Sequence, residues 1–394
     1  MQAYKAIIWV CLFILFYSYF GYALLVWCYL QLKGKKESLR EENTDFEPSV
    51  SLIVAAYNEE QVIKKKIENC LEIDYPRNKL KLVFVADGST DNTAAIIKQF
   101  PGVDMLYKKE RQGKVAAINR AMSTAGTEFV VFCDANTALN RNCIRAIVKH
   151  YQDERVGAVA GEKKVIAPVE GIIPVKDGEG AYWKYESKLK KIDSDFYSVV
   201  GAAGELFSIR TKLYEPLPAD ILLDDFVISM NICRMGYRVV YEPGAFAIET
   251  PSLTIKDELK RKIRISAGGF QSILLLMDLL NIFKYGRLSF LYISHRVLRW
   301  VLCPVLLPVL FACSFIVARR FGFDVNTVYH LLFYSQVAFY SMAIAGWLFS
   351  KWGVRNNIFF IFYYFVFMNM ALYIGFFRFI GNKQTVLWDK ARRS

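Results

Sequence analysis

Four long apolar stretches constrain this chain more than any other feature of its sequence. The first covers residues 6–29, and the other three cover residues 301–318, 328–349 and 358–380. A helix needs about 20 predominantly apolar residues to cross the hydrocarbon core of a bilayer. The stretches therefore predict four transmembrane helices, one before and three after the middle of the chain.

The first stretch could alternatively be a signal peptide. It is longer than the usual apolar region of such a peptide, and no small-residue cleavage pattern follows it. We therefore interpret residues 1–32 as a retained anchor. The segment 33–40 after it is basic, and positive residues favour the cytoplasmic side, so we expect the chain to enter the cytosol there.

The charge of the C-terminal tail complicates this topology. Four crossings with a cytosolic middle would place both termini outside, whereas the tail 382–394 carries Lys383, Lys390, Arg392 and Arg393. Positive residues favour the inside. One of the stretches could therefore be re-entrant or interfacial, and the sequence leaves this alternative open.

The composition suits a chain that lies partly in water and partly in lipid. Hydrophobic residues make up 54% and charged residues still make up 22%. The net charge of +13 suits a membrane surface and a phosphorylated substrate. No zinc-finger, RNP or basic-zipper pattern is present, which argues against nucleic acid. The eight cysteines show no CxxC spacing and are typical of thiols in a reducing compartment.

Residues 33–250 are predicted to form a soluble α/β domain. β-rich runs at 49–56, 80–86, 129–133 and 158–160 alternate with helical patterns such as 59–71 and 91–99. This alternation predicts a mostly parallel sheet with helices on both faces, and ligands of such sheets gather at the carboxyl ends of the strands.

Residues 251–297 have a different character. Six charged residues between positions 257 and 264 precede the apolar run 273–280. This pattern predicts amphipathic helices in the membrane interface, with a simple surface helix of the α/β domain as the alternative. Residues 298–381 would then hold the last three spans.

Two motifs follow the first two predicted strands. The first, residues 54–60, places Ala56, Tyr57 and Glu59 where small residues leave room for a ligand, although Asn58 could simply cap a helix. The second contains Asp87 and Asp91 around Gly88. Either aspartate can accept hydrogen bonds from a base or ribose, and Asp91 could equally be only a cap.

Basic and acidic motifs follow at later positions. Lys114 and Arg111 lie on either side of Gly113 in a loop that suits a diphosphate contact, although basic residues on a loop can also simply be solvated. Asp134 and Asn136 end an apolar run, and their oxygens suit Mg²⁺ or Mn²⁺ shared with substrate phosphates. Asp224 and Asp225 supply a candidate general base, against the alternative that both merely favour a helix N-terminus.

In their order and spacing, these motifs resemble the inverting family 2 glycosyltransferases with a GT-A fold. The flanking spans make the chain similar to the membrane-embedded hyaluronan, chitin, poly-N-acetylglucosamine and cellulose synthases. The resemblance implies a Rossmann-like mixed sheet in the cytosol, a UDP-sugar donor, a divalent cation and a multi-pass location in the plasma (inner) membrane. A glycan or lipid-linked acceptor is implied as partner.

The resemblance also implies individual roles. Asp225 would be the base beside Asp224, and Asp134 and Asn136 would match the metal-binding Asp-x-Asp motif with Asn as a departure. The donor would contact residues of the four motifs and of the segment after them: Ala56, Tyr57, Glu59, Asp87, Lys114, Asp134, Arg261 and Arg264. The acceptor loop would include Gly204 and Glu205.

The segment 261–265 departs furthest from the processive synthases. Arg261 and Ile265 stand where those enzymes have Gln and Trp, and Arg264 is kept. The missing Trp would remove a stacking platform for the acceptor sugar. The favoured function is extension of a β-linked polysaccharide with export across the membrane. Single-sugar transfer to a lipid-linked acceptor is the alternative, and an inactive nucleotide-binding scaffold is the alternative outside the enzymes.

Overall fold

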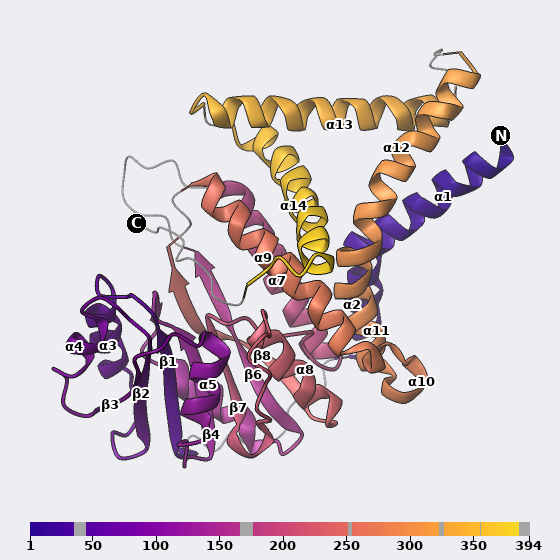
Figure 1. Cartoon of the computed structure of the whole chain (residues 1–394). Coiled ribbons are helices and arrows are strands. Elements are labelled where there is room, and N and C mark those ends of the chain that lie inside the picture. Colours follow the sequence, from indigo (N-terminus) through magenta and orange to yellow (C-terminus); the bar gives the residue numbers. More distant parts are fainter. Residues whose placement is uncertain (35–44, 166–175, 251–253, 323–326, 355, 386–394) are drawn as a thin grey trace.

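The computed structural model describes residues 1–34, 45–165, 176–250, 254–322, 327–354 and 356–385. The basic positions 35–40, 390, 392 and 393, on which the expected topology partly depends, lie outside these ranges. An α/β domain carries the sheet, and a group of long helices stands on one side of it (Figure 1).

One mixed sheet of eight strands forms the centre of the α/β domain, in the order β3-β2-β1-β4-β7-β6-β8-β5. The strands are β1 (Val50–Ala56), β2 (Leu80–Asp87), β3 (Val103–Lys108), β4 (Phe129–Asp134), β5 (Thr137–Leu139), β6 (Val156–Val165), β7 (Leu206–Arg210) and β8 (Arg238–Glu249). β3, β2, β1 and β4 are parallel neighbours, while β7 runs antiparallel to β4 and β6. The predicted parallel sheet is thus correct for the first half, and the second half is mixed.

Six helices of this domain complete it: α3 (Ile63–Leu71), α4 (Thr93–Ile97), α5 (Lys114–Met122), α6 (Cys143–Val148), α7 (Lys176–Phe196) and α8 (Asp224–Arg234). Short 3-10 turns cover Lys149–Gln152 and Thr211–Leu213. Two separate buried clusters, one with α3 and α6 and one with α5 and α8, show that helices cover both faces, as expected.

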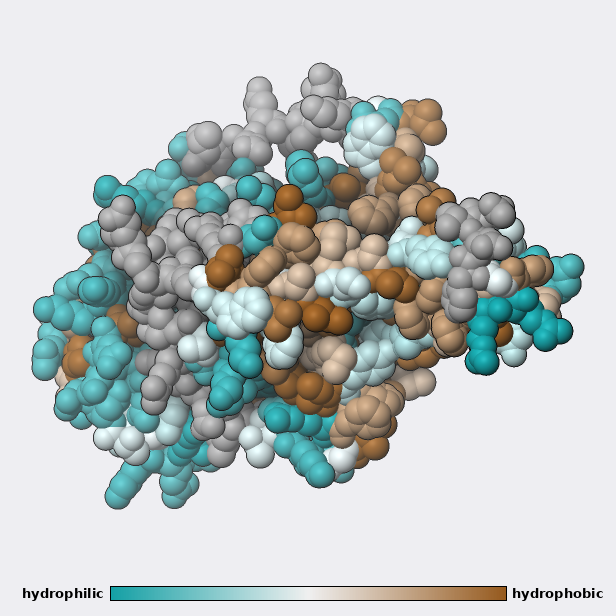
Figure 2. All heavy atoms as spheres, turned by 90° about the horizontal axis from the view of Figure 1, so that it is seen from above, coloured by the Kyte–Doolittle hydropathy of each residue, from teal (hydrophilic) through white to brown (hydrophobic). Residues whose placement is uncertain are grey.

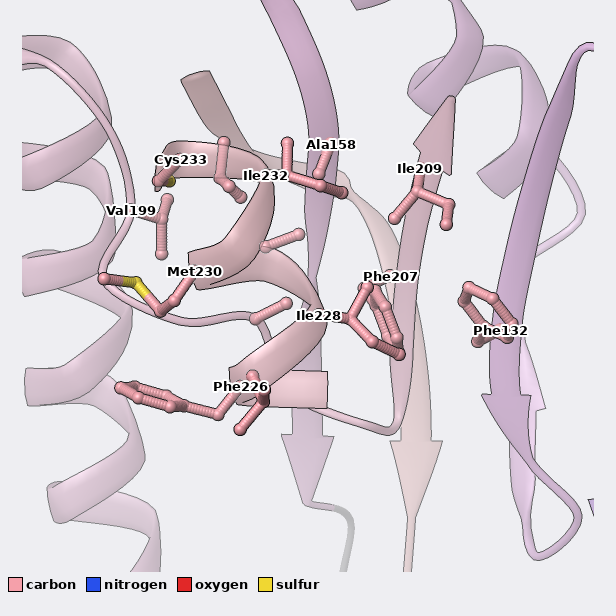
Figure 3. Close-up of a cluster of buried hydrophobic side chains, with 14 of the residues drawn as sticks. Phe132, Ala158, Val199, Phe207, Ile209, Phe226, Ile228, Met230, Ile232 and Cys233 are labelled. Carbon is pink, nitrogen blue, oxygen red and sulfur yellow. The ribbon is translucent and has the colours of Figure 1, made fainter. Parts of the chain in front are cut away.

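Helix α8 lies between the sheet and the long helices. Ile228 lies beside Phe207 of β7, which in turn faces Phe132 of β4, whereas Phe226 points away from the strands (Figure 3). Phe226 meets the Trp300 ring at a centroid distance of 5.5 Å. Because α8 begins at Asp224, this packing fixes the acidic pair between the two parts of the molecule.

The long helices contain four segments that are long and apolar enough to cross a membrane, within the described residues. They are Gln2–Lys33, Arg287–Arg320, Val328–Lys351 and Ile358–Ile380. The first joins α1 (Gln2–Phe16) and α2 (Tyr22–Lys33) through the π-helical turn Tyr17–Gly21. The second joins α11 (Arg287–Tyr292), the π-helical segment Ile293–Leu302 and α12 (Cys303–Arg320). The others are α13 (Val328–Lys351) and α14 (Asn357–Ile380).

These helices do not form a parallel bundle. α1 and α12 slope away from the sheet, α13 lies across the ends of α12 and α14 farthest from the sheet, and α14 returns toward α9 (Ile255–Leu275) (Figure 1). Seen from the side of α13, apolar side chains gather over the helices and polar ones over the α/β domain (Figure 2). The helices therefore expose the kind of surface that lipid covers.

Helix α9 (Ile255–Leu275) joins the two parts, with a 3-10 turn (Met277–Leu280) and α10 (Ile282–Tyr285) after it. Its small residues permit three close approaches. A Cβ on Gly268 would lie 2.6 Å from Leu223, and one on Gly269 would lie 2.8 Å from Trp300. Gly375 of α14 packs as tightly on Ser266. The charged N-terminal half of α9 thereby reaches the site described below.

Candidate active site

A cavity of about 1350 Å³ lies at the carboxyl ends of β1, β2 and β4, and it continues between the long helices. Apart from Asp91, the predicted site residues all line it: Ala56, Tyr57, Glu59, Asp87, Lys114, Asp134, Asn136, Gly204, Glu205, Asp224, Asp225, Arg261 and Arg264. They come from loops and helices that are far apart in the sequence. The structure thus brings the predicted residues together, and their individual roles stay predictions.

A lysine holds the centre of the polar part of the cavity. Lys114 Nζ lies 2.8 Å from Asp134 Oδ1 and 3.6 Å from Asp224 Oδ2. Burial lowers the pKa of Lys114, but the carboxylates of Asp134, Asp224 and Asp225 outweigh burial and raise it. The side chain of Lys114 therefore stays cationic in the polar part of the cavity. A cation at this position suits contact with a diphosphate.

Asp225, the second residue of the acidic pair at the start of α8, has a raised pKa. Burial and the adjacent Asp224 raise the pKa of Asp225 to about 7, while Lys114 opposes this shift. Asp225 Oδ1 accepts a hydrogen bond from the Phe226 backbone N–H at 2.9 Å. A carboxylate with a pKa near neutrality is suited to take a proton from a hydroxyl group.

Asp87 organises the loop that carries Lys114. Its Oδ2 accepts hydrogen bonds from the backbone N–H groups of Gln112 and Gly113 at 2.9 and 2.7 Å. Its Oδ1 accepts one from Arg120 Nη2 at 3.0 Å. A donor base at Asp87 would therefore share an oxygen that already holds the loop.

Gly88 lets that loop approach β2. It has a φ of +68°, and a Cβ there would lie 2.4 Å from Arg111 N. Arg111 in turn lies over the ring of Tyr57, with Cζ 3.7 Å from the ring centroid. This cation–π pair closes one side of the cavity. The sequence motif predicted a diphosphate contact for Arg111, and that role stays a prediction.

Asp91 takes the cap role that the sequence left as an alternative. Its Oδ1 accepts hydrogen bonds from Thr93 N at 3.0 Å and Thr93 Oγ1 at 2.6 Å. These bonds outweigh burial and lower the pKa of Asp91. The residue is not among those that line the cavity.

The oxygens around Asp134 are compatible with a divalent cation held partly by substrate. Asp134 is partly exposed to the cavity, and Asn136 Nδ2 donates to Glu249 Oε1 at 3.4 Å. No cluster of three His, Cys, Asp or Glu side chains suited to a metal occurs in the described part of the chain. Mg²⁺ commonly uses one or two protein oxygens together with substrate phosphates. The residues present fit such a shared site.

The two residues predicted for the acceptor differ in their surroundings. A Cβ on Gly204 would lie 3.1 Å from Lys114 Nζ and 3.2 Å from Asp225 Oδ2, so a larger residue would press on the ends of both side chains. Glu205 Oε1 lies 2.5 Å from Lys163 Nζ. Burial raises the pKa of Glu205, but Lys163 outweighs it and lowers the pKa. Glu205 is thus an ion-pair partner in the wall of the cavity.

The two arginines predicted for the leaving diphosphate come from α9. Arg261 makes two hydrogen bonds of 3.0 Å to the fully buried carboxylate of Glu258. Arg264 donates to Leu222 O at 3.4 Å, two residues before the acidic pair. Burial lowers the pKa of Arg264 while the neighbouring aspartates support its charge. Ile265 also lines the cavity, at the position where the synthases have Trp.

Three further lining residues have no counterpart in the sequence motifs. Trp183 and Lys190 come from α7, and Trp300 comes from the π-helical segment of the second long apolar helix. The spacing of seven residues between Trp183 and Lys190 places them on one face of a helix. That spacing was a usable signal, but the start of α7 carries no pattern that distinguishes it from a loop.

The fold has a close counterpart among solved structures. A mannosyltransferase from Pyrobaculum calidifontis, PcManGT, solved in complex with GDP-Man and Mn²⁺, superimposes with a TM-score of 0.73 at 22% sequence identity. The likeness covers 97% of this chain and 100% of that one. It shows that the chain has the predicted GT-A fold with its helical additions.

The sequence of the α/β domain identifies it. Residues 51–217 match the model of Glycosyl transferase family 2. The chain carries a family 2 glycosyltransferase domain. The match covers the motifs from β1 to the loop after Gly204, so Lys114, Asp134 and Gly204 belong to the glycosyltransferase domain, and Asp225 and Arg264 follow it.

Curated relatives extend the match beyond this domain. The poly-β-1,6-N-acetyl-D-glucosamine synthase of Staphylococcus aureus (strain COL) is 25% identical over 259 residues, which are 62% of this chain and 60% of the relative. The probable glycosyltransferase YdaM of Bacillus subtilis (strain 168) is 24% identical over 248 residues, 58% of this chain and 56% of that protein. The chain thus spans about 60% of the length of the relatives it matches.

Proposed function

We propose that the protein is an inverting hexosyltransferase that moves a sugar from a nucleotide-sugar donor to an acceptor hydroxyl. The observation that carries this proposal is the position of Asp225. It lines the same cavity as Lys114 and Arg264, and its pKa of about 7 suits a general base. The glycosyltransferase domain and its relatives support this reaction class.

The mechanism is a single displacement. Asp225 takes the proton from the acceptor hydroxyl, and the oxygen attacks the anomeric carbon as the bond to the diphosphate breaks. Lys114 and Arg264 attract the charge that develops on the departing diphosphate. Asp134 and Asn136 would hold Mg²⁺ or Mn²⁺, which would supply further neutralisation of that charge. Because attack is in line, an α-linked donor gives a β-linked product.

The donor is proposed to be a UDP-sugar, with a GDP-sugar as the second candidate because the solved mannosyltransferase holds GDP-Man. Release of UDP or GDP from the purified full-length protein, measured with a panel of both donor classes, tests the proposal. No nucleotide release with any donor would leave the inactive scaffold as the better interpretation.

Two products are proposed. The first is a growing β-linked polysaccharide passed through the membrane, as the name of the Staphylococcus aureus relative suggests. The second is one sugar added to a lipid-linked acceptor. Sizing the product made from a radiolabelled donor separates them, because a ladder indicates polymer and a single species indicates one transfer.

We further propose that the protein is a multi-pass plasma-membrane protein with its catalytic domain in the cytosol. In this proposal residues 33–250 are the catalytic domain, 251–297 the interfacial region and 298–381 the helical region. The placement of α13 across the far ends of α12 and α14 supports three crossings with α13 in the opposite interface (Figure 1). That arrangement keeps the basic tail inside, as the positive-inside tendency requires. Accessibility of single introduced cysteines to a membrane-impermeant label tests it.

A further inference from the structure

Two arginines lie in the π-helical part of the second membrane-compatible segment, at positions 296 and 299. A cation in such a segment is costly in lipid unless it faces protein or water and has a partner. The side chains of Arg296 and Arg299 are only 12% and 10% exposed, and both line the cavity. They share the carboxylate of Glu186, at 3.2 and 2.8 Å. The pairing with Glu186 explains how both charges are held, but the two arginines differ in what else they contact.

Arg296 also contacts a loop of the glycosyltransferase domain. Its Nε donates to the backbone oxygen of Val200 at 3.3 Å, while its Nη1 donates to Glu186 Oε2 at 3.2 Å. Val200 is fully buried, and a buried carbonyl group needs a donor. The guanidinium serves both acceptors because its nitrogens are fixed in a planar fork. Arg299 instead places its guanidinium 5.4 Å from the ring of Tyr185.

The loop that follows, residues 201–204, lies against the helix that carries the acidic pair. The Ala202 backbone N–H donates to Ser229 Oγ at 2.9 Å, and that hydroxyl donates to Asp225 O at 2.8 Å. At the end of the loop, a Cβ on Gly204 would lie 3.2 Å from Asp225 Oδ2. A shift of the loop by about 1 Å would therefore change the space in which an acceptor hydroxyl meets Asp225.

The same membrane segment supports the loop through a second set of contacts. The guanidinium of Arg296 lies 5.6 Å from the centroid of the Trp300 ring, and that ring meets Phe226 at a centroid distance of 5.5 Å. Gly201 has a φ of +83°, and a Cβ there would lie 2.1 Å from the Phe226 ring. The Phe226 backbone N–H in turn donates to Asp225 Oδ1. The segment thus contacts both the loop and the residue that orients the candidate base.

We propose that Arg296 is a positioning residue for the transfer reaction, because it anchors the loop 201–204 and thereby fixes the space beside Asp225. Arg296 acts through the loop and through Phe226, while Asp225 stays the group that takes the proton. The geometry of the catalytic base thus depends on the packing of the second membrane segment. This inference deepens the proposed function and rests on it for the reaction, but the anchoring of the loop does not depend on turnover.

The first experiment compares Arg296→Lys with the matched control Arg299→Lys in the purified full-length protein in detergent. Both variants keep a cation beside Glu186, but a lysine offers one nitrogen in place of the two that Arg296 uses, so the bond to Val200 O weakens. We expect Arg296→Lys to lower kcat about tenfold with the donor KM within about twofold, and Arg299→Lys to change kcat less than about twofold. Equal effects would mean that Arg296 only neutralises Glu186, and would overturn the proposal.

The second experiment measures the loop directly, by hydrogen exchange of the backbone amides of residues 201–205 without donor or acceptor. Loss of one hydrogen bond to the loop should speed this exchange about fivefold in Arg296→Lys and leave it unchanged in Arg299→Lys. Exchange in α3, which lies in the other buried cluster, should be the same in all proteins. Unchanged exchange in the loop of Arg296→Lys would overturn the anchoring even if kcat falls.

A variant on the other side of the loop keeps the test independent of the arginine. Ser229→Ala removes the acceptor of the Ala202 N–H, so it should also speed loop exchange and lower kcat. Faster exchange with unchanged kcat would show that the position of the loop does not matter to transfer, and would overturn the proposal. If no donor gives nucleotide release, the proposed function fails, while faster loop exchange in Arg296→Lys alone would still establish the anchor.

Discussion

The acidity of Asp225 makes a prediction that couples activity to stability. A carboxyl group whose pKa rises from 3.8 to about 7 costs the folded state up to about 4 kcal/mol when it is ionised. Partial exposure to water in the cavity reduces this value. The substitution Asp225→Asn removes the charge and keeps the shape, so it should remove both the cost and the general base.

The direction of the pKa shift of Asp225 determines how the stability of the folded protein changes with pH. Between pH 3.8 and about 7 the folded protein holds a proton on Asp225 that the unfolded chain has lost, so wild-type stability falls as the pH rises through that range. The Asn variant has no such dependence. The stability gained by the variant should grow by at most about 2 kcal/mol between pH 5.5 and pH 7 and stay constant above.

The assay is thermal unfolding of both proteins in the same detergent at pH 5.5, 7 and 8, with transfer measured in parallel. We expect the variant to unfold at a higher temperature at pH 8, with a smaller difference at pH 5.5, and to lose about 100-fold or more of its transfer rate while it still binds the donor nucleotide. Wild-type kcat/KM should rise with pH to a plateau above about 7. A stability difference that is independent of pH, or undiminished transfer, would refute the assignment of Asp225 as the base.

Three further predictions concern other parts of the site. Gly204→Ala should lower kcat about tenfold with little change in nucleotide affinity, because its Cβ would crowd Lys114 and Asp225, and unchanged kcat would contradict this. Asp91→Ala should cost about 1 kcal/mol of stability in a melting experiment without raising the donor KM, since Asp91 binds Thr93 and the Glu60 backbone N–H and does not line the cavity. Chelation with EDTA should stop transfer and Mn²⁺ or Mg²⁺ should restore it, whereas full activity in the chelator would remove the metal from the mechanism.

Sequence reasoning located the strands that carry the site with small errors. The predicted runs at 49–56, 80–86 and 129–133 end within one residue of β1, β2 and β4. These strands are buried on both faces, so each is a continuous apolar run that ends in polar residues. β3, β5, β7 and β8 were not predicted, because they lie toward the edges of the sheet or in its mixed half and carry no comparable run.

The acidic residues of the site could be recognised from the sequence because of the apolar residues before them. Asp134, Asp224 and Asp225 follow apolar residues, where unpaired carboxylates are costly, and this made them stand out. The alternatives at Asp87 and Asp91 could not be separated that way. Asp87 is the last residue of β2, and Asp91 follows it by four residues. Only the hydrogen bonds of the folded chain show that Asp87 binds the loop of Lys114 and that Asp91 accepts from Thr93 at the start of α4.

The sequence by itself determined that this protein has membrane-compatible helices, an α/β domain and a set of acidic and basic motifs. These properties depend on hydropathy and on residues close together in the chain. The tertiary structure alone decided that the cavity continues from the polar site between the long helices and that α13 lies across its neighbours. Each of these depends on contacts between segments more than 70 residues apart, such as Glu186 with Arg296 and Phe226 with Trp300. Periodicity within one segment carries no information about such contacts, because it constrains only which face of an element is buried.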